Sequence, residues 1–124
     1  MTSKVKSLHW VGSSKKDYQT FPEEVQYAMG YGLYLAQEGK RAESAKSLKG
    51  FGGTSVVELI EDHHGDTYRA VYTVQFSEAV YVLHAFQKKS KSGIATPKTD
   101  IDLIKRRYRE AQADHREFVK GRMH

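Results

Sequence analysis

Apolar residues recur at two different spacings in the first third of the chain, and these spacings predict a strand followed by a helix. Residues Lys4 to Val11 alternate loosely between polar and apolar types, as a strand does. From Thr20 the period becomes three and four residues, which places one set of side chains on a single helix face: Phe21, Val25, Met29, Gly32, Leu33 and Ala36. The sequence Thr20-Phe21-Pro22-Glu23 has the form of a capping box, so we expect the helix to begin there and to end at Gly39.

Three tyrosines form a second row on this predicted helix, at Tyr27, Tyr31 and Tyr34. Because tyrosine combines a large apolar ring with a polar tip, such a row usually packs as a half-buried flank against a neighbouring element. We prefer that interpretation. The alternative is an exposed surface for a partner protein.

The second half of the chain predicts an antiparallel meander and a final helix. A short segment at 41–46 is expected to be helical, and the glycines within 49–55 predict a loop. Strands are expected at 56–61, 68–74 and 79–86, because β-branched and aromatic residues are frequent there and the connections are too short for crossover helices. Thr96-Pro97 predicts the cap and first position of a helix whose core face has three- and four-residue steps: Ile101, Ile104, Tyr108, Ala111, His115 and Phe118.

These elements together predict an α+β fold in one domain spanning residues 1–124. The expected sheet is small, twisted and mainly antiparallel, and consists of the N-terminal strand plus the three-stranded meander. An N-terminal helical hairpin and the C-terminal helix are expected to cover it.

Composition excludes several classes of protein. The 124 residues include no cysteine, which rules out disulfides, thiolate catalysis and iron–sulfur clusters. No apolar run approaches the ~18 residues of a membrane span, and the N-terminus lacks the apolar core of a signal peptide. We therefore expect a cytoplasmic protein with no membrane partner.

Positive charge is concentrated in one part of the chain. The formal net charge is +5, which favours an anionic partner. The window from Ala79 to Arg109 holds eight basic and two acidic residues, so it carries more positive charge than the whole chain does. Lys88, Lys89, Lys91 and Lys98 lie within it.

Common catalytic motifs are absent from the sequence, and no cofactor or metal is expected. There is no nucleotide-binding fingerprint, no HExxH and no GxSxG motif. The glycine-rich loop leads into β-branched Val56 and Val57, so it is not a phosphate loop. His63 and His64 are adjacent in a turn, and we expect them to be structural or exposed.

The candidate chemistry lies on two neighbouring strands. Arg69 belongs to the middle strand of the meander, while His84 and Lys88 share one face of the next strand with Phe86. Cleavage of RNA by its own 2′-hydroxyl needs a proton acceptor, cations for the phosphate charge and a proton source for the leaving group. Histidine can exchange protons near neutral pH, and arginine and lysine can hold phosphate. This interpretation expects the cations to converge on one shallow surface.

Each of these residues also has a structural interpretation. Arg69 is equally well explained as the ion-pair partner of Glu58 or Glu61 on the adjacent strand. His84 is equally explained as a half-buried residue bonded to a backbone carbonyl, and the lysines are explained as part of a solvated loop. The residues by themselves indicate a basic domain that binds a polyanion.

Several segments of the sequence resemble the RelE/ParE superfamily of bacterial toxins, most closely its HigB-like, phage-derived branch. They are Tyr68-Arg69-Ala70-Val71-Tyr72, then Leu83-His84-Ala85-Phe86-Gln87-Lys88-Lys89-Ser90, and then Thr96-Pro97. The resemblance implies the toxin of a type II toxin–antitoxin pair, a ribosome-dependent endoribonuclease that cuts mRNA. It also implies a helix-turn-helix antitoxin as partner.

The resemblance also implies roles for individual residues. Arg69 matches the strand arginine that contacts the scissile phosphate, Lys88 and Lys89 stand at the second cation, and His84 is a candidate base or acid. Lys49, Lys91 and Lys98 are expected to hold RNA phosphates. Glu58, Glu61 and Asp62 stand where relatives add basic residues. The alternatives are a non-catalytic basic binding module and a gyrase-directed inhibitor of the ParE type.

Overall fold

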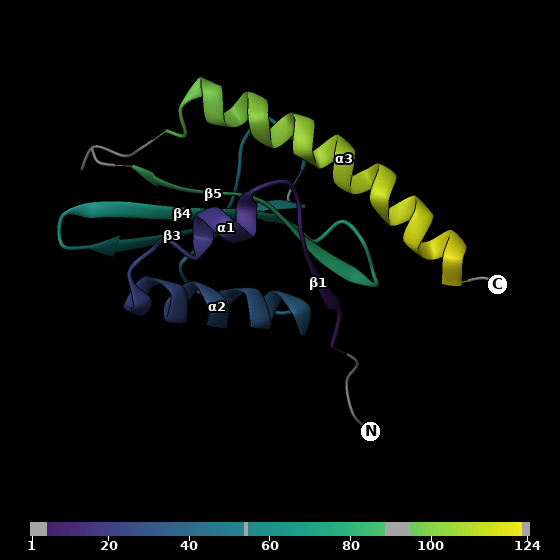
Figure 1. Ribbon diagram of the computed structural model, residues 1–124, viewed down its shortest axis with the longest axis horizontal. Helices are drawn as coiled ribbons and strands as arrows, with labels where there is room; N and C mark the ends of the chain where they lie inside the picture. Colours follow the sequence, from purple (N-terminus) through teal and green to yellow (C-terminus); the bar gives the residue numbers. More distant parts are fainter. Residues whose placement is uncertain (1–4, 54, 89–94, 123–124) are drawn as a thin grey trace.

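The computed structural model describes residues 5–53, 55–88 and 95–122 (Figure 1). Its elements are strands and helices in mixed order, as expected for an α+β fold. They are β1 (Ser7–Trp10), α1 (Ser14–Tyr18), α2 (Glu23–Gln37), β2 (Ala45–Ser47), β3 (Val56–His63), β4 (Asp66–Thr73), β5 (Ala79–Lys88) and α3 (Lys98–Arg122).

The strands form one five-stranded sheet in the order β1-β5-β4-β3-β2. The predicted meander is confirmed, because β3 pairs antiparallel with β4 and β4 pairs antiparallel with β5. The N-terminal strand β1 lies beside β5 and runs parallel to it. The sheet is therefore mainly antiparallel, and its first and last strands along the chain, β1 and β5, lie side by side at one edge.

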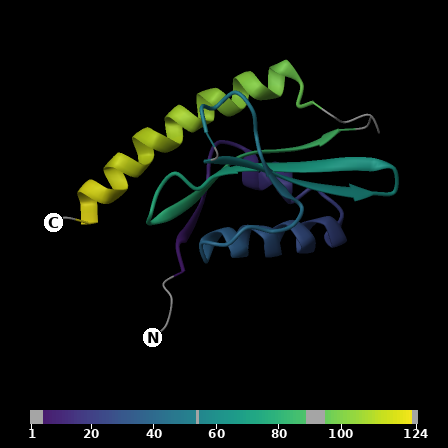
Figure 2. The same ribbon diagram turned by 180° about the vertical axis from the view of Figure 1, so that it is seen from behind.

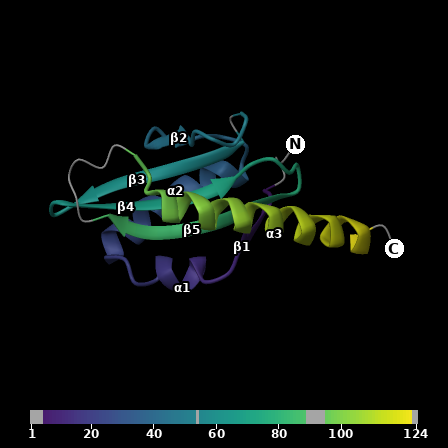
Figure 3. The same ribbon diagram turned by 90° about the horizontal axis from the view of Figure 1, so that it is seen from above.

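Helices cover both faces of the sheet (Figures 1 and 2). Helix α2 lies on one face, where its predicted apolar row packs into a core with alternate residues of the strands. Helix α3 crosses the other face, where Ile104 and Ala111 pack on Val71, Tyr81 and Leu83. Seen from above, α3 runs over the middle of the sheet and continues past its edge (Figure 3). Each face of the sheet is thus buried under one long helix.

The segment at 41–46 was predicted to be helical, and this prediction is wrong. Ala45–Ser47 form the edge strand β2, which pairs antiparallel with Val57–Leu59 of β3. The edge of β3 supplies backbone hydrogen-bond partners that the local sequence does not reveal, so pairing overrides the local preference. The short second helix lies instead before α2, as α1, in a stretch between the predicted strand and helix for which no element was expected.

Both predicted helix starts differ in their caps. Helix α2 begins at Glu23 after Pro22, without a side-chain cap, and the Thr20 hydroxyl donates to the Asp17 carbonyl oxygen at 2.7 Å instead. The Thr20 hydroxyl therefore closes α1 rather than opening α2. Helix α3 begins at Lys98, so Pro97 precedes its first residue and the Thr96 side chain bonds elsewhere. The predicted end of α2 is confirmed, because Gly39 has a positive φ of 80°.

The tyrosine row on α2 is exposed, so the preferred half-buried interpretation is wrong. The exposed fractions are 83% for Tyr27, 61% for Tyr31 and 45% for Tyr34. The opposite face of α2 meets the sheet closely at Gly32, where an added Cβ would lie 2.7 Å from Leu59 Cδ2. Because the helix touches the sheet along that row alone, the tyrosines have no neighbouring element to cover them.

A bulge in β5 decides which side chains face α3. Val71 of β4 pairs with His84 and Tyr72 pairs with Val82, so Leu83 is an additional residue on β5. Leu83 and His84 consequently both lie on the α3 side of the sheet. The buried guanidinium of Arg107 on α3 donates from NH1 to the Leu83 carbonyl oxygen at 3.0 Å, which anchors the helix to the bulge.

Candidate functional site

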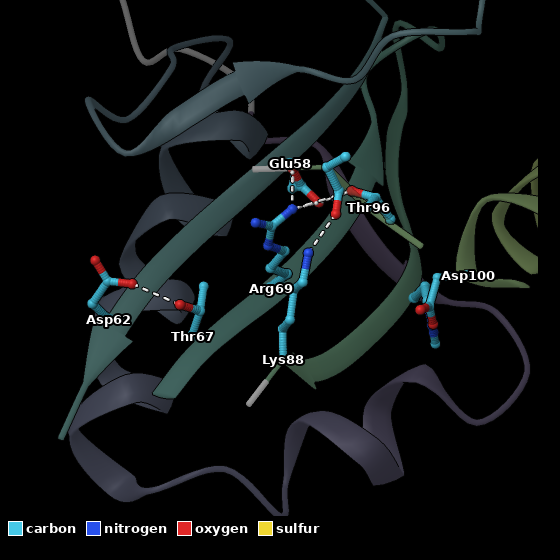
Figure 4. Close-up of polar contacts among 9 residues, drawn as sticks. Glu58, Asp62, Thr67, Arg69, Lys88, Thr96 and Asp100 are labelled. Atoms are coloured by element: carbon cyan, nitrogen blue, oxygen red, sulfur yellow. Dashed lines mark hydrogen bonds and ion pairs between the residues drawn. The ribbon is translucent and has the colours of Figure 1, made fainter. Parts of the chain in front are cut away.

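The candidate residues Arg69, His84 and Lys88 lie on the α3 face of the sheet. Figure 4 shows Arg69 and Lys88 next to Thr96, with Asp100 at a distance from them. Arg69 comes from β4, and His84 and Lys88 come from β5. The regular register beyond the bulge pairs Arg69 with Phe86 and Thr67 with Lys88. Alternation then puts all three side chains on one face, as the sequence predicted.

Arg69 is buried and paired with a carboxylate. Its exposed fraction is 1%, that of Glu58 is 2%, and Arg69 NH1 lies 3.3 Å from both Glu58 oxygens. NH1 also donates to the Thr96 hydroxyl oxygen at 3.2 Å, while that hydroxyl donates to Glu58 Oε2 at 2.8 Å. These three side chains form a closed polar cluster beneath the segment that leads into α3 (Figure 4).

This burial corrects the expectation that Arg69 lies on an open cationic surface. The structure instead shows the alternative arrangement, an ion pair with the adjacent strand, and identifies Glu58 as the partner. The physical reason is that a guanidinium inside the protein must be neutralised, and Glu58 is the acidic residue that β3 directs to the same face. Glu61 lies on the other face of β3, and Asp62 accepts a hydrogen bond from Thr67 at 3.0 Å.

Lys88 lies next to this cluster and is partly exposed. Its Nζ donates to the Ala95 carbonyl oxygen at 2.5 Å, one residue before Thr96 (Figure 4). Lys88 and Arg69 are thus bonded to consecutive residues of the same segment. Unlike Arg69, Lys88 makes no ion pair with any residue in the described part of the chain.

His84 is paired with an acid that the sequence analysis did not single out. Its Nε2 lies 2.7 Å from Asp100 Oδ1, in the first turn of α3, and its ring stacks on Phe86 with centroids 4.7 Å apart. The His84 ring is nearly buried, and its Nδ1 has no hydrogen-bond partner among the described residues. The bond to Asp100 fixes the orientation of the ring, and it replaces the backbone carbonyl contact that was the alternative.

The remaining predicted cations are dispersed. Lys49 is exposed in the loop after β2, two residues before Phe51, whose ring packs edge-on against Tyr108 of α3. Lys98 is exposed at the start of α3, and its Nζ lies 3.1 Å from Asp102 Oδ2. Lys89 and Lys91 lie outside the described residues, so their predicted roles remain predictions.

Thr96 and Asp100 are the site residues that sequence reasoning missed. Thr96 was assigned to a helix cap, whereas its hydroxyl links Arg69 to Glu58. Asp100 is the acidic residue of the first turn of α3, a position usually explained by the helix dipole. The sequence did contain a signal for Asp100. This residue follows the end of β5 by only twelve residues, so its carboxylate can reach a side chain of that strand.

The opposite part of the α3 face holds a second polar contact. Tyr81 donates from its hydroxyl to Asp114 Oδ2 at 2.9 Å. Burial, followed by the neighbouring Asp114 carboxylate, raises the pKa of Tyr81 well above its ordinary value.

Among the described residues, no group of three or more histidine, aspartate or glutamate side chains is placed to hold a metal ion. No described helix has the length and apolar character needed to cross a bilayer.

Comparisons with solved structures identify the fold. The isolated E. coli RelE toxin superposes with a TM-score of 0.53 and 20% identity, over 82% of this chain and 97% of that one. A mutant of E. coli RelE in the free state gives a TM-score of 0.53 and 19% identity, over 72% and 87%. The RelBE2 toxin–antitoxin complex of Mycobacterium tuberculosis gives 0.47 and 12%, over 72% and 98%. A search of curated proteins gives no significant sequence match.

The likeness to RelE confirms the predicted fold class, a mainly antiparallel sheet between helices. The sequence family is also identified, because residues 16–109 match the family described as "Phage derived protein Gp49-like (DUF891)". That match spans most of the chain and includes the cluster around Arg69, His84 and Lys88. The chain therefore belongs to the phage-derived Gp49-like family, and it has the fold of the RelE toxins.

Proposed function

We propose that this protein is the toxin of a type II toxin–antitoxin pair and that it cleaves mRNA on the ribosome. The observation that supports this most directly is that Arg69, His84 and Lys88 lie on one face of the sheet and that each bonds to a residue within 95–100, at the start of α3. Transfer of the phosphate to a 2′-hydroxyl needs cations and a proton carrier in one place, and no metal. The family and the RelE-like fold are consistent with this activity.

Lys88 is the cation that meets the phosphate first in this proposal. Its ammonium is partly exposed and bonds to a neutral carbonyl oxygen, so it can exchange that partner for a phosphate oxygen without leaving an unpaired carboxylate. Arg69 contributes when a phosphate oxygen replaces the Thr96 hydroxyl on NH1, while Glu58 stays bonded. The segment at Ala95 and Thr96 must therefore move when RNA binds.

His84 carries the proton in this mechanism, and Asp100 is its positioning residue. The Asp100 carboxylate holds Nε2, and it stabilises the imidazolium that forms when the ring accepts a proton. Proton exchange takes place at Nδ1, which has no hydrogen-bond partner among the described residues, and the proton taken there from the 2′-hydroxyl is then given to the 5′-oxygen leaving group. Lys89, Lys91, Lys49 and Lys98 hold neighbouring phosphates in this proposal.

The partner in this proposal is a helix-turn-helix antitoxin that neutralises the toxin in the cell. The exposed tyrosines of α2 lie on the opposite face of the sheet from the candidate site. A protein can therefore contact that face without competing for the cations. Co-expression of a small helix-turn-helix protein encoded beside this one is expected to restore growth.

Controlled expression in a bacterium tests the nuclease. We expect induction of the wild-type protein to arrest growth and to produce codon-phased mRNA 5′ ends. Lys88→Ala is expected to reduce those ends about 100-fold, the usual cost of losing one group that stabilises transition-state charge. Lys46→Ala is the matched control, because Lys46 is an exposed lysine on the edge strand β2.

The arginine requires a conservative variant. Arg69→Ala leaves Glu58 buried without its partner, so loss of activity would report misfolding as much as chemistry. Arg69→Lys keeps a cation beside Glu58 but removes the planar guanidinium fork. We expect Arg69→Lys to stay folded by circular dichroism and to lose most of the cut ends.

A specific observation favours the second candidate function, a non-catalytic binding module. The ion pair with Glu58 neutralises Arg69, and the bond to Asp100 occupies His84. Growth arrest with intact messages would contradict the nuclease and support binding or a gyrase mechanism. Relaxed plasmid supercoiling in the arrested cells would then identify the gyrase-directed alternative.

A further inference from the structure

Basic side chains form a straight row along the outer face of α3. Five members are spaced seven and four residues apart, so residues eleven apart differ by only ~20° around the helix. All five are exposed. We call them the basic row: Lys98, Lys105, Arg109, Arg116 and Lys120. At 1.5 Å per residue the row is about 33 Å long.

The charges of the row are almost entirely unneutralised. Lys98 pairs with Asp102, and no other member makes an ion pair with a described residue. Two acids of the same half of the helix, Glu110 and Asp114, lie more than 90° around the helix from Arg109 and Arg116, whereas Glu117 lies about 60° from Lys120. Asp114 faces Tyr81 on the sheet side. The outer side of α3 is therefore mainly basic, with Asp102 and Glu117 as the acids nearest to the row.

The shape of the row identifies the kind of partner. A bilayer surface is not a fit, because none of the large apolar side chains exposed on the described residues belongs to α3. A single line of cations with a repeating spacing matches a linear polyanion, whose charges also repeat along a line. The row begins beside Thr96 and Lys88, so it continues directly from the candidate site.

We propose that the basic row binds the sugar–phosphate backbone of an RNA strand that runs along α3. The proposal rests on the proposed function in naming RNA as the polyanion, but it does not depend on cleavage. Arg116 and Lys120 lie beyond the region that matches the family, which ends at residue 109. The C-terminal half of α3 thus adds a docking surface to the shared part of the fold.

Binding of a labelled RNA analogue tests the proposal separately from the chemistry. The probe is a 20-nucleotide 2′-O-methyl oligouridine with a 5′ fluorescein, which lacks the attacking hydroxyl and remains intact. The test variant is Arg109→Glu/Arg116→Glu/Lys120→Glu. The control is Lys15→Glu/Lys16→Glu/Lys46→Glu, which makes the same change in net charge at exposed residues of α1 and β2 that do not belong to the row.

We expect the test variant to bind at least 100-fold more weakly than wild type at 50 mM salt. The magnitude of the slope of log affinity against log salt should decrease by about 2. Each of the three lost phosphate contacts accounts for ~0.7 of this decrease. The control variant should bind within 3-fold to 5-fold of wild type. Circular dichroism should show both variants folded, since every substituted residue is exposed.

Three outcomes would overturn the proposal. Equal weakening by both variants would show that net charge alone drives binding. Unchanged binding by the test variant would place RNA elsewhere. Competition by a 20-residue polyglutamate as effective as unlabelled RNA would assign the row to an acidic protein.

Failure of the row and failure of the nuclease can be told apart. Loss of mRNA cutting in Lys88→Ala with normal probe binding supports the row and the nuclease together. Normal probe binding without any cutting by the wild-type protein overturns the nuclease alone.

Discussion

Glu58 and Arg69 are the residues whose environment most changes the chemical picture. Both are almost completely buried, and their charges face each other across the β3–β4 pair. Burial of a charge is costly unless it is paired, so each of the two residues depends on the other for its place in the fold. The cation proposed for catalysis is therefore also part of the protein interior.

A double-mutant cycle tests this dependence. Arg69→Met and Glu58→Leu should each lower the free energy of unfolding by about 3–5 kcal/mol, because each leaves one buried charge unpaired. The double variant should recover most of that loss, measured by urea denaturation. The exposed pair provides the control, since Asp102→Ala should change stability by less than about 1 kcal/mol. Additive losses in the double variant would show that the two charges do not compensate each other.

The raised pKa of Tyr81 should make the stability of the protein fall at alkaline pH. This pKa is raised by burial and by Asp114, so above about pH 10 the unfolded chain loses this proton while the folded protein keeps it. Stability is then fully present below pH 10 and falls as the pH rises above it. Tyr81→Phe should flatten that fall in thermal melts between pH 9 and 11. Tyr27→Phe, at an exposed tyrosine, should retain the wild-type slope, and an equal slope in both variants would contradict the assignment.

The two long helices are positioned by different kinds of contact. Helix α2 approaches β3 closely at position 32, where an added Cβ would displace the Leu59 side chain, whereas α3 is fixed to β5 by the buried Arg107 at the bulge. Gly12 assists there, because its φ is 57° and a Cβ would lie 2.8 Å from Arg107 Nε. Apolar packing holds both faces, and the α3 face has directional hydrogen bonds in addition. The face with directional bonds is the one that carries the candidate site.

Substitution of Gly32 tests the close packing of α2. Gly32→Ala should gain up to about 1 kcal/mol in helix propensity but lose more through overlap with Leu59, for a net destabilisation of about 1–2 kcal/mol. Thermal denaturation provides the measurement. Gly121→Ala is the matched control, because an added Cβ there meets nothing within 4 Å. A Gly32→Ala protein as stable as wild type would mean that α2 can shift away from the sheet at no cost.

Across the whole molecule, the α3 face combines the candidate site with the basic row, while the α2 face carries the tyrosines. This separation lets binding and chemistry be altered independently. Lys88 acts at the reacting phosphate in the proposed function, whereas Arg109, Arg116 and Lys120 act on the strand beyond it. The two sets of variants should therefore fail in different ways.

Salt separates these two failures. In a cell-free translation mixture, the Arg109→Glu/Arg116→Glu/Lys120→Glu protein should cut mRNA poorly at 150 mM salt and recover at least 10-fold at low salt or high protein concentration, because its defect is in affinity. Lys88→Ala should stay about 100-fold impaired under all these conditions. Mapping of 5′ ends measures both, and recovery of Lys88→Ala at low salt would move Lys88 from chemistry to binding.

The sequence by itself determined the local parts of this protein. The core rows of α2 and α3, the meander and the shared face of His84, Phe86 and Lys88 follow from periodicity, because helix and strand geometry fix which residues share a face. The capping prediction at Thr20 and the helical prediction at 41–46 failed, since a carbonyl of α1 and the free edge of β3 supplied competing hydrogen bonds.

Tertiary structure alone decided the charge environment of the candidate site. Strand pairing offered Glu58 or Glu61 as the partner of Arg69, and only the packed structure selected Glu58 and added Thr96, which is 27 residues away. Asp100 is 16 residues from His84, and no local pattern connects these two residues. The electrostatic state of a buried group is set by the distance to its neighbours and by the exclusion of water. Both quantities exist only once the sheet and α3 have packed together.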